Sequence, residues 1–239
     1  MAGPRILVVE HEESCPPHLV GTWLTEAGCT LEVCRPYAGD VLPDLTSYDG
    51  VLVLGGEMGA DDDHVAWLPP LKAAIRDAVE ARTALLGICL GHQLIAVALG
   101  GEVSPNPLGQ TVGLTDVVWT AAAAADDWVA GHTGDEVAIH WNNDVVTRLP
   151  EGAVALAHSP GGEVQVARFG PRAWGIQAHP EVDADVVRQW AVTERDEHVS
   201  LGRDPDAVLA AIEGAGAALT AHWQPLTARF AALTGEDRT

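Results

Sequence analysis

The residues best suited to covalent chemistry lie around Cys89, in the sequence GICLG over residues 87–91. The apolar run 84–88 before it is typical of a buried parallel strand, and the apolar residues of 94–99 after it are typical of the inward face of a helix. The G-x-C-x-G spacing is the thiol counterpart of the nucleophile elbow, where glycines let strand and helix approach closely. At such a helix N-terminus, unpaired N–H groups favour a thiolate. We therefore predict that Cys89 is a nucleophile and not a structural cysteine in the core, although burial is the commoner fate of free cysteines.

A partner base is predicted in the tripeptide His179-Pro180-Glu181. Pro180 favours an extended conformation for His179, so the side chains of residues 179 and 181 point the same way. Glu181 can then orient one imidazole nitrogen while the other faces a thiol, as in a nucleophile–base–orienter triad. The tripeptide alone would be better explained as a surface turn, but the elbow upstream favours the triad. His92, three residues after Cys89, points along the side of a helix and is predicted to pack near the site.

Composition narrows the class of protein. The chain has 13 Lys and Arg residues and 34 Asp and Glu residues, so its formal net charge is −21. This negative charge disfavours nucleic acid and anionic membrane surfaces as partners. The four cysteines show neither C-x-x-C pairs nor zinc-ligand spacing, so a reducing compartment is expected. The N-terminal sequence has one basic residue and only a short apolar run, so we expect neither a signal peptide nor a membrane anchor, and no stretch is apolar over the length of a transmembrane helix. We expect a cytoplasmic protein without a cofactor.

Alternation of strands and helices predicts right-handed crossovers and a parallel sheet. Strands are expected over 5–10, 30–34, 48–56 and 84–88, and helices over 18–28 and 69–82. Short strands at 137–140, 145–146, 154–158 and 164–169 are expected to form an antiparallel extension, and 172–178 a last strand leading into His179. The region 183–198 is predicted to be helical, and 204–234 to form two helices around Gly214, Gly216 and Pro225. Because ligands gather at the carboxyl ends of parallel strands, Gly55-Gly56 and Cys89 are expected to share one crevice.

The acidic stretch 57–64 contains Glu57, three consecutive aspartates and His64. A divalent ion usually needs ligands that return from elsewhere in the fold, and adjacent aspartates more often form a solvated loop or cap a helix. We therefore predict no metal site there.

These motifs together resemble the triad, or class I, glutamine amidotransferases. The resemblance rests on GICLGHQ at 87–93, on His179-Pro180-Glu181 and on a strand ending in Gly55-Gly56, and it covers roughly residues 5 to 190. It implies a flavodoxin-like open sheet with helices on both faces. It also implies a nucleophile, a base and an orienter at Cys89, His179 and Glu181. The remaining implied site residues are Gly56 and Leu90, whose backbone N–H groups would form the oxyanion hole, and Gln93, Gly55, Asn142 and Asn143, which would bind the substrate.

Two positions depart from the family pattern. Many members have proline after the second glycine, where this chain has Glu57, so the oxyanion-hole loop is expected to be less constrained. The His-x-Asp stretch of the family corresponds here to Trp141-Asn142-Asn143-Asp144, with Asn142 in the histidine place. We expect altered substrate affinity but retained activity.

The implied function is hydrolysis of the side-chain amide of glutamine through a Cys thioester, releasing ammonia and glutamate. An alternative with the same triad is a stand-alone hydrolase of γ-glutamyl peptides or amines, and an alternative of another class is a binding or regulatory module with a vestigial site. A synthase subunit is an expected partner in the first case. We expect residues 1–200 to form the amidotransferase domain and 201–239 a C-terminal helical extension packed on it.

Overall fold

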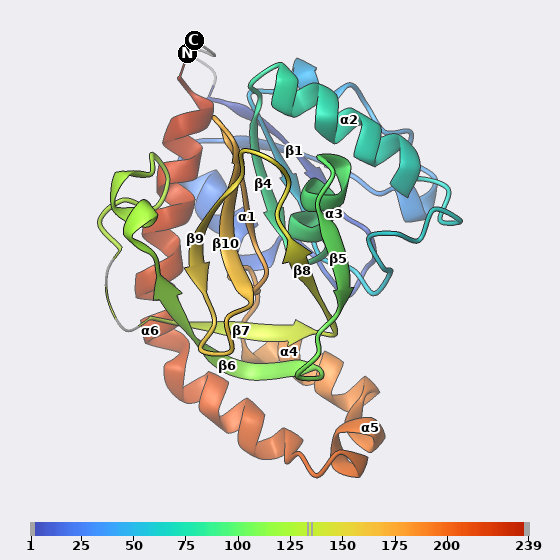
Figure 1. The fold of residues 1–239 in the computed structure, drawn as a ribbon, viewed down its shortest axis with the longest axis vertical. Helices are drawn as coiled ribbons and strands as arrows, with labels where there is room; N and C mark the ends of the chain where they lie inside the picture. Colours follow the sequence, from blue (N-terminus) through green and yellow to red (C-terminus); the bar gives the residue numbers. More distant parts are fainter. Residues whose placement is uncertain (1–2, 133, 135, 237–239) are drawn as a thin grey trace.

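The computed structural model describes residues 3–132, 134 and 136–236, which fold around one large twisted sheet (Figure 1). Within the described residues the sheet has nine strands in the order β2-β1-β3-β4-β11-β10-β9-β6-β7, and β5 pairs with β8 in a separate two-stranded sheet. The strands are β1 Arg5–Val9, β2 Thr30–Cys34, β3 Gly50–Val53, β4 Ala84–Ile88, β5 Glu102–Pro105, β6 Thr111–Trp119, β7 Glu136–Asn142, β8 Asp144–Arg148, β9 Val154–His158, β10 Val164–Gly170 and β11 Ala173–Ile176. The α-helices are α1 His18–Glu26, α2 Leu68–Glu80, α3 Leu90–Ala98, α4 Ala184–Thr193, α5 Arg195–Ser200 and α6 Pro205–Thr234.

The sheet divides into a parallel part and an antiparallel part, as the sequence predicts, but the strand expected at 145–146 belongs to β8 and pairs with β5 outside this sheet. Strands β2, β1, β3, β4 and β11 run parallel, and β3 and β11 flank the strand that precedes Cys89. Strands β10, β9, β6 and β7 continue the sheet in antiparallel fashion. The carboxyl ends of β3 and β4 therefore lie side by side, which places Gly55-Gly56 next to Cys89.

Helices cover both faces of the sheet, because β1, β3 and β4 are apolar on both sides. One core cluster contains residues of α1, α4 and α6, among them Trp23, Val187 and Trp223. The other contains residues of α2 and α3, such as Leu71 and Leu94. Parallel strands with helices on both faces form the open α/β architecture that was predicted.

Two helix boundaries differ from the prediction. The region 183–198 is broken into α4 and α5 at Glu194, whose carboxylate accepts hydrogen bonds from Trp141 Nε1 at 3.0 Å and from Gln110 Nε2 at 3.1 Å. The region 204–234, predicted as two helices, forms the single helix α6 with Pro225 inside it. Pro225 is exposed, while the buried side chains of α6 continue past it without a shift, so packing outweighs the lost backbone hydrogen bond. These buried side chains are Ile212, Leu219, Trp223, Leu226 and Phe230.

Helix α6 packs against the same sheet as the rest of the chain. Phe230 is fully buried, and Trp128 Nε1 donates to the Leu226 carbonyl at 2.9 Å.

We predict that Phe230→Ala lowers the free energy of unfolding by about 3 to 5 kcal/mol, because truncating a buried phenylalanine leaves a cavity. Urea unfolding of Phe230→Ala and of Gln224→Ala, an exposed position on the same helix, measures the difference. A second transition at low urea in the wild-type protein would show instead that α6 unfolds as an independent unit.

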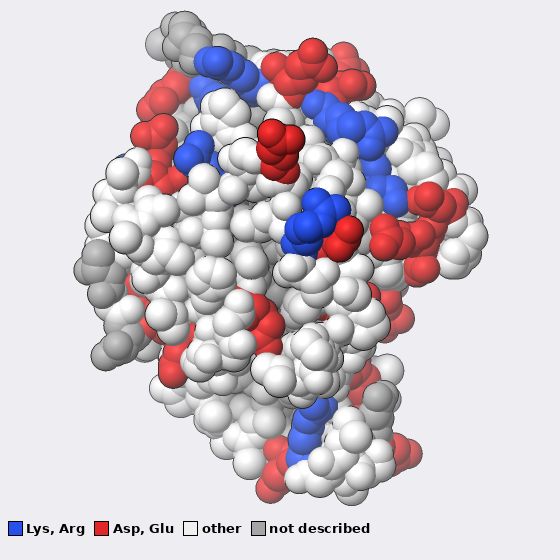
Figure 2. All heavy atoms as spheres, viewed as in Figure 1, with Lys and Arg blue, Asp and Glu red and all other residues white. Residues whose placement is uncertain are grey.

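Charged side chains are scattered over the face of the molecule drawn in Figure 2. Groups of Asp and Glu lie there among fewer Lys and Arg, and broad areas carry neither. Among the described residues, no helix has the length and apolar character needed to cross a membrane.

Candidate active site

Cys89 occupies a strained turn between β4 and α3. Its backbone has φ 50° and ψ −105°, outside the regions that L-residues ordinarily adopt, which typically costs about 1 to 3 kcal/mol. A Cβ atom on Gly91 would lie 2.1 Å from the Val53 carbonyl oxygen, and one on Gly87 would lie 2.5 Å from the Gly91 backbone. The two glycines are therefore required by the close approach of strand and helix. This is the elbow geometry that presents a nucleophile at a helix N-terminus.

His179 and Glu181 lie immediately beyond β11, the strand next to β4. His179 Nδ1 and Glu181 Oε1 are 2.7 Å apart, and both side chains are buried. The His179 N–H donates to the Ile139 carbonyl at 2.8 Å, and the Leu19 N–H donates to the Glu181 carbonyl at 2.9 Å, so both backbones are held. A Cβ atom on Gly55 would lie 3.2 Å from His179 Cε1 and 3.6 Å from Cys89 Cβ, which places both side chains over this glycine.

The charges of this group favour an imidazolium. Burial by itself lowers the pKa of His179, but the Glu181 carboxylate and then the Cys89 side chain outweigh it and hold the pKa well above its usual value. Glu181 thus stabilises positive charge on a ring that faces a thiol on its other side. An imidazolium beside a thiolate is the ion pair from which a cysteine nucleophile attacks.

The thiol opens into a cavity of about 280 Å³ at the carboxyl end of the parallel strands. Six of the nine predicted site residues line it: Cys89, His179, Gly56, Gln93, Asn142 and Asn143. The other three lie directly behind its wall. Gly55 lies under the His179 and Cys89 side chains, Leu90 is the first residue of α3, and Glu181 lies behind His179. The structure brings the nine residues together, and their individual roles stay predictions.

The two predicted oxyanion-hole donors flank Cys89. In the described part of the chain, neither the Gly56 N–H nor the Leu90 N–H has a hydrogen-bond acceptor. The N–H of Leu90 is free because it belongs to the first turn of α3. Two unpaired N–H groups beside a nucleophile are what an oxyanion hole requires.

Two residues that contact Cys89 or His179, Gln177 and Trp190, were not predicted from the sequence. Gln177 Nε2 lies 3.7 Å from Cys89 Sγ, and its Oε1 accepts from Gln93 Nε2 at 3.2 Å. Its place two residues before His179 on an extended chain was a usable signal, because alternate residues share a face. Trp190 contacts the His179 ring edge-on with centroids 5.0 Å apart, and its Nε1 donates to the Ser14 carbonyl at 3.1 Å. No local pattern connects Trp190 to the elbow.

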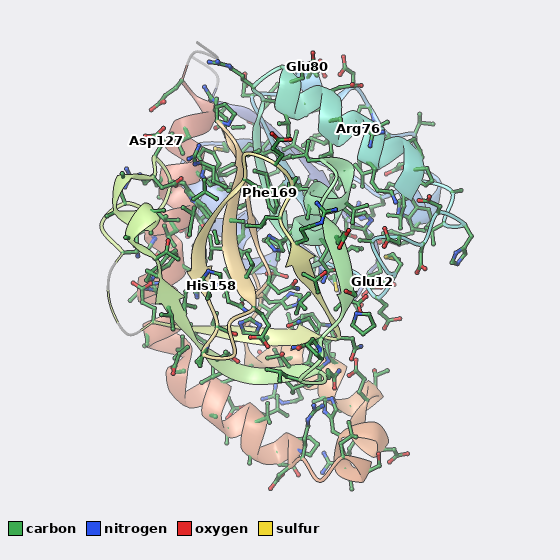
Figure 3. The ribbon with its side chains drawn as sticks, viewed as in Figure 1. Glu12, Arg76, Glu80, Asp127, His158 and Phe169 are labelled. Atoms are coloured by element: carbon green, nitrogen blue, oxygen red, sulfur yellow. The ribbon has the colours of Figure 1, made fainter. Side chains whose placement is uncertain are left out.

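The loop after Gly56 is held by Glu12, a residue that the sequence analysis did not single out. The Glu57 N–H donates to Glu12 Oε2 at 3.1 Å, and Glu12 Oε1 accepts from Ser14 Oγ at 2.6 Å and from Cys15 Sγ at 3.1 Å. Glu12 follows β1 in the chain, and Figure 3 labels it at the right-hand side of the molecule. Glu12 thus supplies a constraint that a proline at position 57 would otherwise provide.

His92 and the aspartates at 61–63 do not line the cavity beside Cys89. His92 is fully buried, its ring lies 5.2 Å from the Phe169 ring, and burial lowers its pKa to about 3, so it packs behind the elbow as predicted. Phe169, labelled in Figure 3, extends from β10 in the middle of the molecule. In the acidic stretch, Asp63 Oδ1 accepts from Lys72 Nζ at 2.6 Å, and Asp62 Oδ2 accepts from the Gly59 N–H at 2.8 Å. These carboxylates organise their own loop.

Cys89 should be the only cysteine that alkylating reagents modify rapidly at neutral pH. Cys15 also lines the cavity, but burial and then the Glu12 charge raise the pKa of its thiol, which stays protonated. Burial also raises the pKa of Cys29 and of Cys34. Brief treatment with iodoacetamide followed by peptide mass mapping measures the four rates. Labelling of Cys15 as fast as that of Cys89 would contradict the elbow assignment.

Comparison with known proteins agrees with this fold and site. The family described as "Glutamine amidotransferase class-I" matches residues 18–189. The glutamine amidotransferase-like protein YfeJ of Salmonella typhimurium is 32% identical over 191 residues, which cover 77% of this chain and 78% of that protein. Gamma-glutamyl peptidase 5 of Arabidopsis thaliana is 30% identical over 151 residues, covering 60% of this chain and 58% of the peptidase. A glutamine amidotransferase structure from Methylobacillus flagellatus superimposes with a TM-score of 0.86 at 27% identity, covering 99% of this chain and 97% of that one.

The fold is an open α/β sheet in which Cys89 occupies a strained strand-to-helix turn beside the buried pair of His179 and Glu181. The chain belongs to the class-I glutamine amidotransferase family. Its relatives include enzymes that act on γ-glutamyl compounds, and this supports enzymatic activity for the chain.

Proposed function

We propose that this protein hydrolyses γ-glutamyl amides through a thioester on Cys89. The observation that carries the proposal is the buried His179–Glu181 pair, 2.7 Å apart, with the ring beside Cys89 at the strained elbow. Burying a charged pair costs free energy unless other groups compensate its charge. A thiolate on Cys89 would compensate the positive charge of the His179 ring.

The reaction follows from the positions of these groups. The Cys89 thiolate attacks the amide carbon, and the N–H groups of Gly56 and Leu90 receive the oxyanion. A donor of this kind lowers the barrier by about 3 kcal/mol. The His179 imidazolium protonates the departing nitrogen, and the amine leaves. His179 then accepts a proton from water, which attacks the thioester and releases glutamate and the free thiol.

The charge of the cavity walls favours a leaving group that carries a positive charge. Among the described lining residues four are carboxylates and none is Lys or Arg. The carboxylates are Glu12, Glu57, Asp144 and Glu194. Burial and then the nearby Asp62 and Asp61 raise the pKa of Asp144, which reflects the crowding of negative charge here. We therefore place γ-glutamyl peptides and amines ahead of free glutamine, reversing the order given by the sequence resemblance, and the similarity to gamma-glutamyl peptidase 5 supports this order.

A matched panel of γ-glutamyl amides tests the substrate class. We predict that a diamine leaving group with one free ammonium gives a kcat/KM at least about tenfold above that of an isosteric neutral amine, equivalent to about 1.4 kcal/mol. An isosteric carboxylate-bearing amine should be poorer than either. The measurement is amine release by the purified chain at low and high salt, because screening reduces the difference. Equal kcat/KM across the three would remove the charge argument.

The same panel separates the other functions. Rapid turnover of glutamine with slow turnover of every larger amide would support a glutaminase that passes ammonia to a synthase partner. No turnover of any member, with folded protein and an unreactive Cys89, would support a binding or regulatory module.

A further inference from the structure

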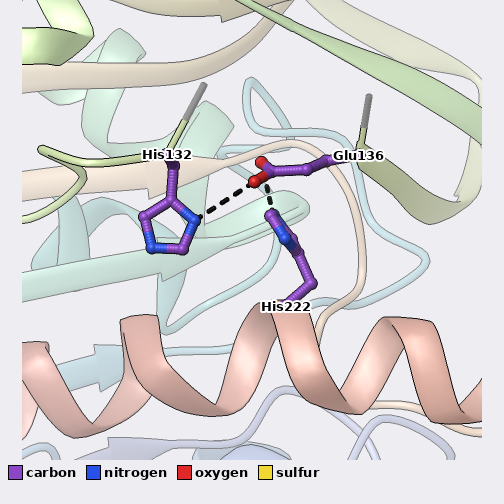
Figure 4. A group of neighbouring side chains, drawn as sticks. All are labelled: His132, Glu136 and His222. Atoms are coloured by element: carbon purple, nitrogen blue, oxygen red, sulfur yellow. Dashed lines mark hydrogen bonds and ion pairs between the residues drawn. The ribbon is translucent and has the colours of Figure 1, made fainter. Parts of the chain in front are cut away.

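A second group of titratable side chains lies outside the active site, where α6 crosses the start of β7. His132, Glu136 and His222 each offer a ligand atom, and these atoms all lie within 4.8 Å of one another. Figure 4 shows the two imidazole rings and the carboxylate pointing toward a common centre, with His222 reaching up from α6. His222 is far from the other two residues in the chain, so no local spacing in the sequence indicates this group.

The geometry of the group is close to that of a transition-metal site. His132 Nδ1 lies 3.2 Å from Glu136 Oε1, and His222 Nε2 lies 2.5 Å from Glu136 Oε2. Ligand atoms of a tetrahedral Zn²⁺ are about 3.3 Å apart, given bonds near 2.0 to 2.1 Å. The distance between His132 and Glu136 is close to that value, and all three ligand atoms lie within 4.8 Å of one another, so shifts of the carboxylate and the rings would be needed to equalise the three distances.

The surroundings of His222 also favour a cation. His222 Nε2 is buried and makes no hydrogen bond of good geometry among the described residues, although it lies against a carboxylate oxygen. A metal ion between the nitrogen and the carboxylate would satisfy both groups.

A surrounding residue orients the carboxylate. Trp119 Nε1, from the end of β6, donates a hydrogen bond to Glu136 Oε2. Metal-ligating carboxylates are commonly held by such an outer hydrogen bond, which fixes their direction. The side chains of His132, Glu136 and His222 are 20%, 12% and 12% exposed, so the group remains accessible to an ion from solvent.

We propose that His132, Glu136 and His222 form a binding site for a divalent transition-metal ion, Zn²⁺ foremost. Two imidazoles and one carboxylate suit Zn²⁺, Co²⁺ or Ni²⁺ better than Mg²⁺ or Ca²⁺, which prefer oxygen ligands alone. Three protein ligands leave a fourth position for water. The bound ion would tie α6 to the segment that precedes β7 and to β7 itself, the strand whose Ile139 carbonyl holds the backbone of His179.

The test is Zn²⁺ binding measured by competition with a chromophoric chelator, after iodoacetamide has blocked reactive thiols in every sample. Wild type and His64→Gln, which removes an exposed histidine, should each bind one Zn²⁺ per chain at this site. His222→Gln and His132→Gln should lose that ion, and Trp119→Phe should weaken its affinity about 10- to 100-fold while keeping all three ligands.

Thermal unfolding provides a second readout that does not depend on activity. Zn²⁺ should raise the Tm of wild type and of His64→Gln but not that of His222→Gln, because an ion that binds only the folded chain stabilises it by mass action. Circular dichroism checks that each variant is folded, and Trp119→Phe serves if a ligand variant is not. Equal Zn²⁺ uptake by wild type and His222→Gln, or no uptake by alkylated wild type, would overturn the proposal.

Discussion

Cys89→Ala should abolish turnover of every γ-glutamyl substrate, with a loss in kcat of at least about 10⁴-fold. The reason is that the thioester cannot form without the thiol, and the remaining groups give only the acceleration of the binding site and oxyanion hole. His179→Ala should be equally inactive, because the amine then leaves without a proton and water attacks without a base. Steady-state amine release from the best substrate of the panel measures both losses.

Matched controls separate a chemical loss from a folding loss. Cys29→Ala also removes a buried thiol, but Cys29 is the residue directly before β2 and does not line the cavity. This variant should keep a kcat near that of the wild type. His64→Ala removes an exposed histidine and should do the same. Measurable turnover in Cys89→Ala that disappears in Cys15→Ala would move the nucleophile to the other cysteine of the cavity.

The predictions from sequence succeeded where neighbours in the chain determine the geometry. The elbow is a local structure, because Gly87 and Gly91 must lack side chains for β4 and α3 to meet around Cys89. The order of Gly56, Cys89 and His179 along alternating strands and helices also sufficed to place them in one cavity, since parallel strands align their carboxyl ends.

The predictions failed where distant parts of the chain decide. Pro225 predicts a break in the last helix, because proline removes a backbone hydrogen bond. The buried side chains along one face of α6 nevertheless pack against the sheet and keep the helix continuous. Glu194 ends α4 while its carboxylate binds Trp141 and Gln110, both of which come from other elements.

The loop at Glu57 shows the same limit. A missing proline predicted a loosely held oxyanion-hole loop, yet the Glu12 carboxylate, supplied by the turn after β1, accepts the Glu57 N–H. A proline at position 57 would remove this donor, so its effect on the loop depends on a partner 45 residues away in the chain. Such a partner becomes visible only once β1 and β3 are known to lie side by side.

Glu181→Gln should leave a remnant activity, with kcat lowered by up to about 10⁴-fold, as expected when an orienting carboxylate becomes an amide. The glutamine can still contact His179 Nδ1, but it cannot stabilise the positive ring that forms between attack and amine release. The Glu181 carboxylate is the largest influence that raises the pKa of His179 against burial. Glu181→Gln therefore lowers the pKa of His179. When the pH is raised, the imidazolium of this variant loses its proton at a lower pH than that of the wild type. The descending limb of the kcat–pH profile should shift toward acid in Glu181→Gln, whereas Glu213→Gln, an exposed glutamate on α6, should keep the wild-type limb. A full rate in Glu181→Gln, or a limb that does not move while kcat falls, would show that this carboxylate only supports the fold around His179.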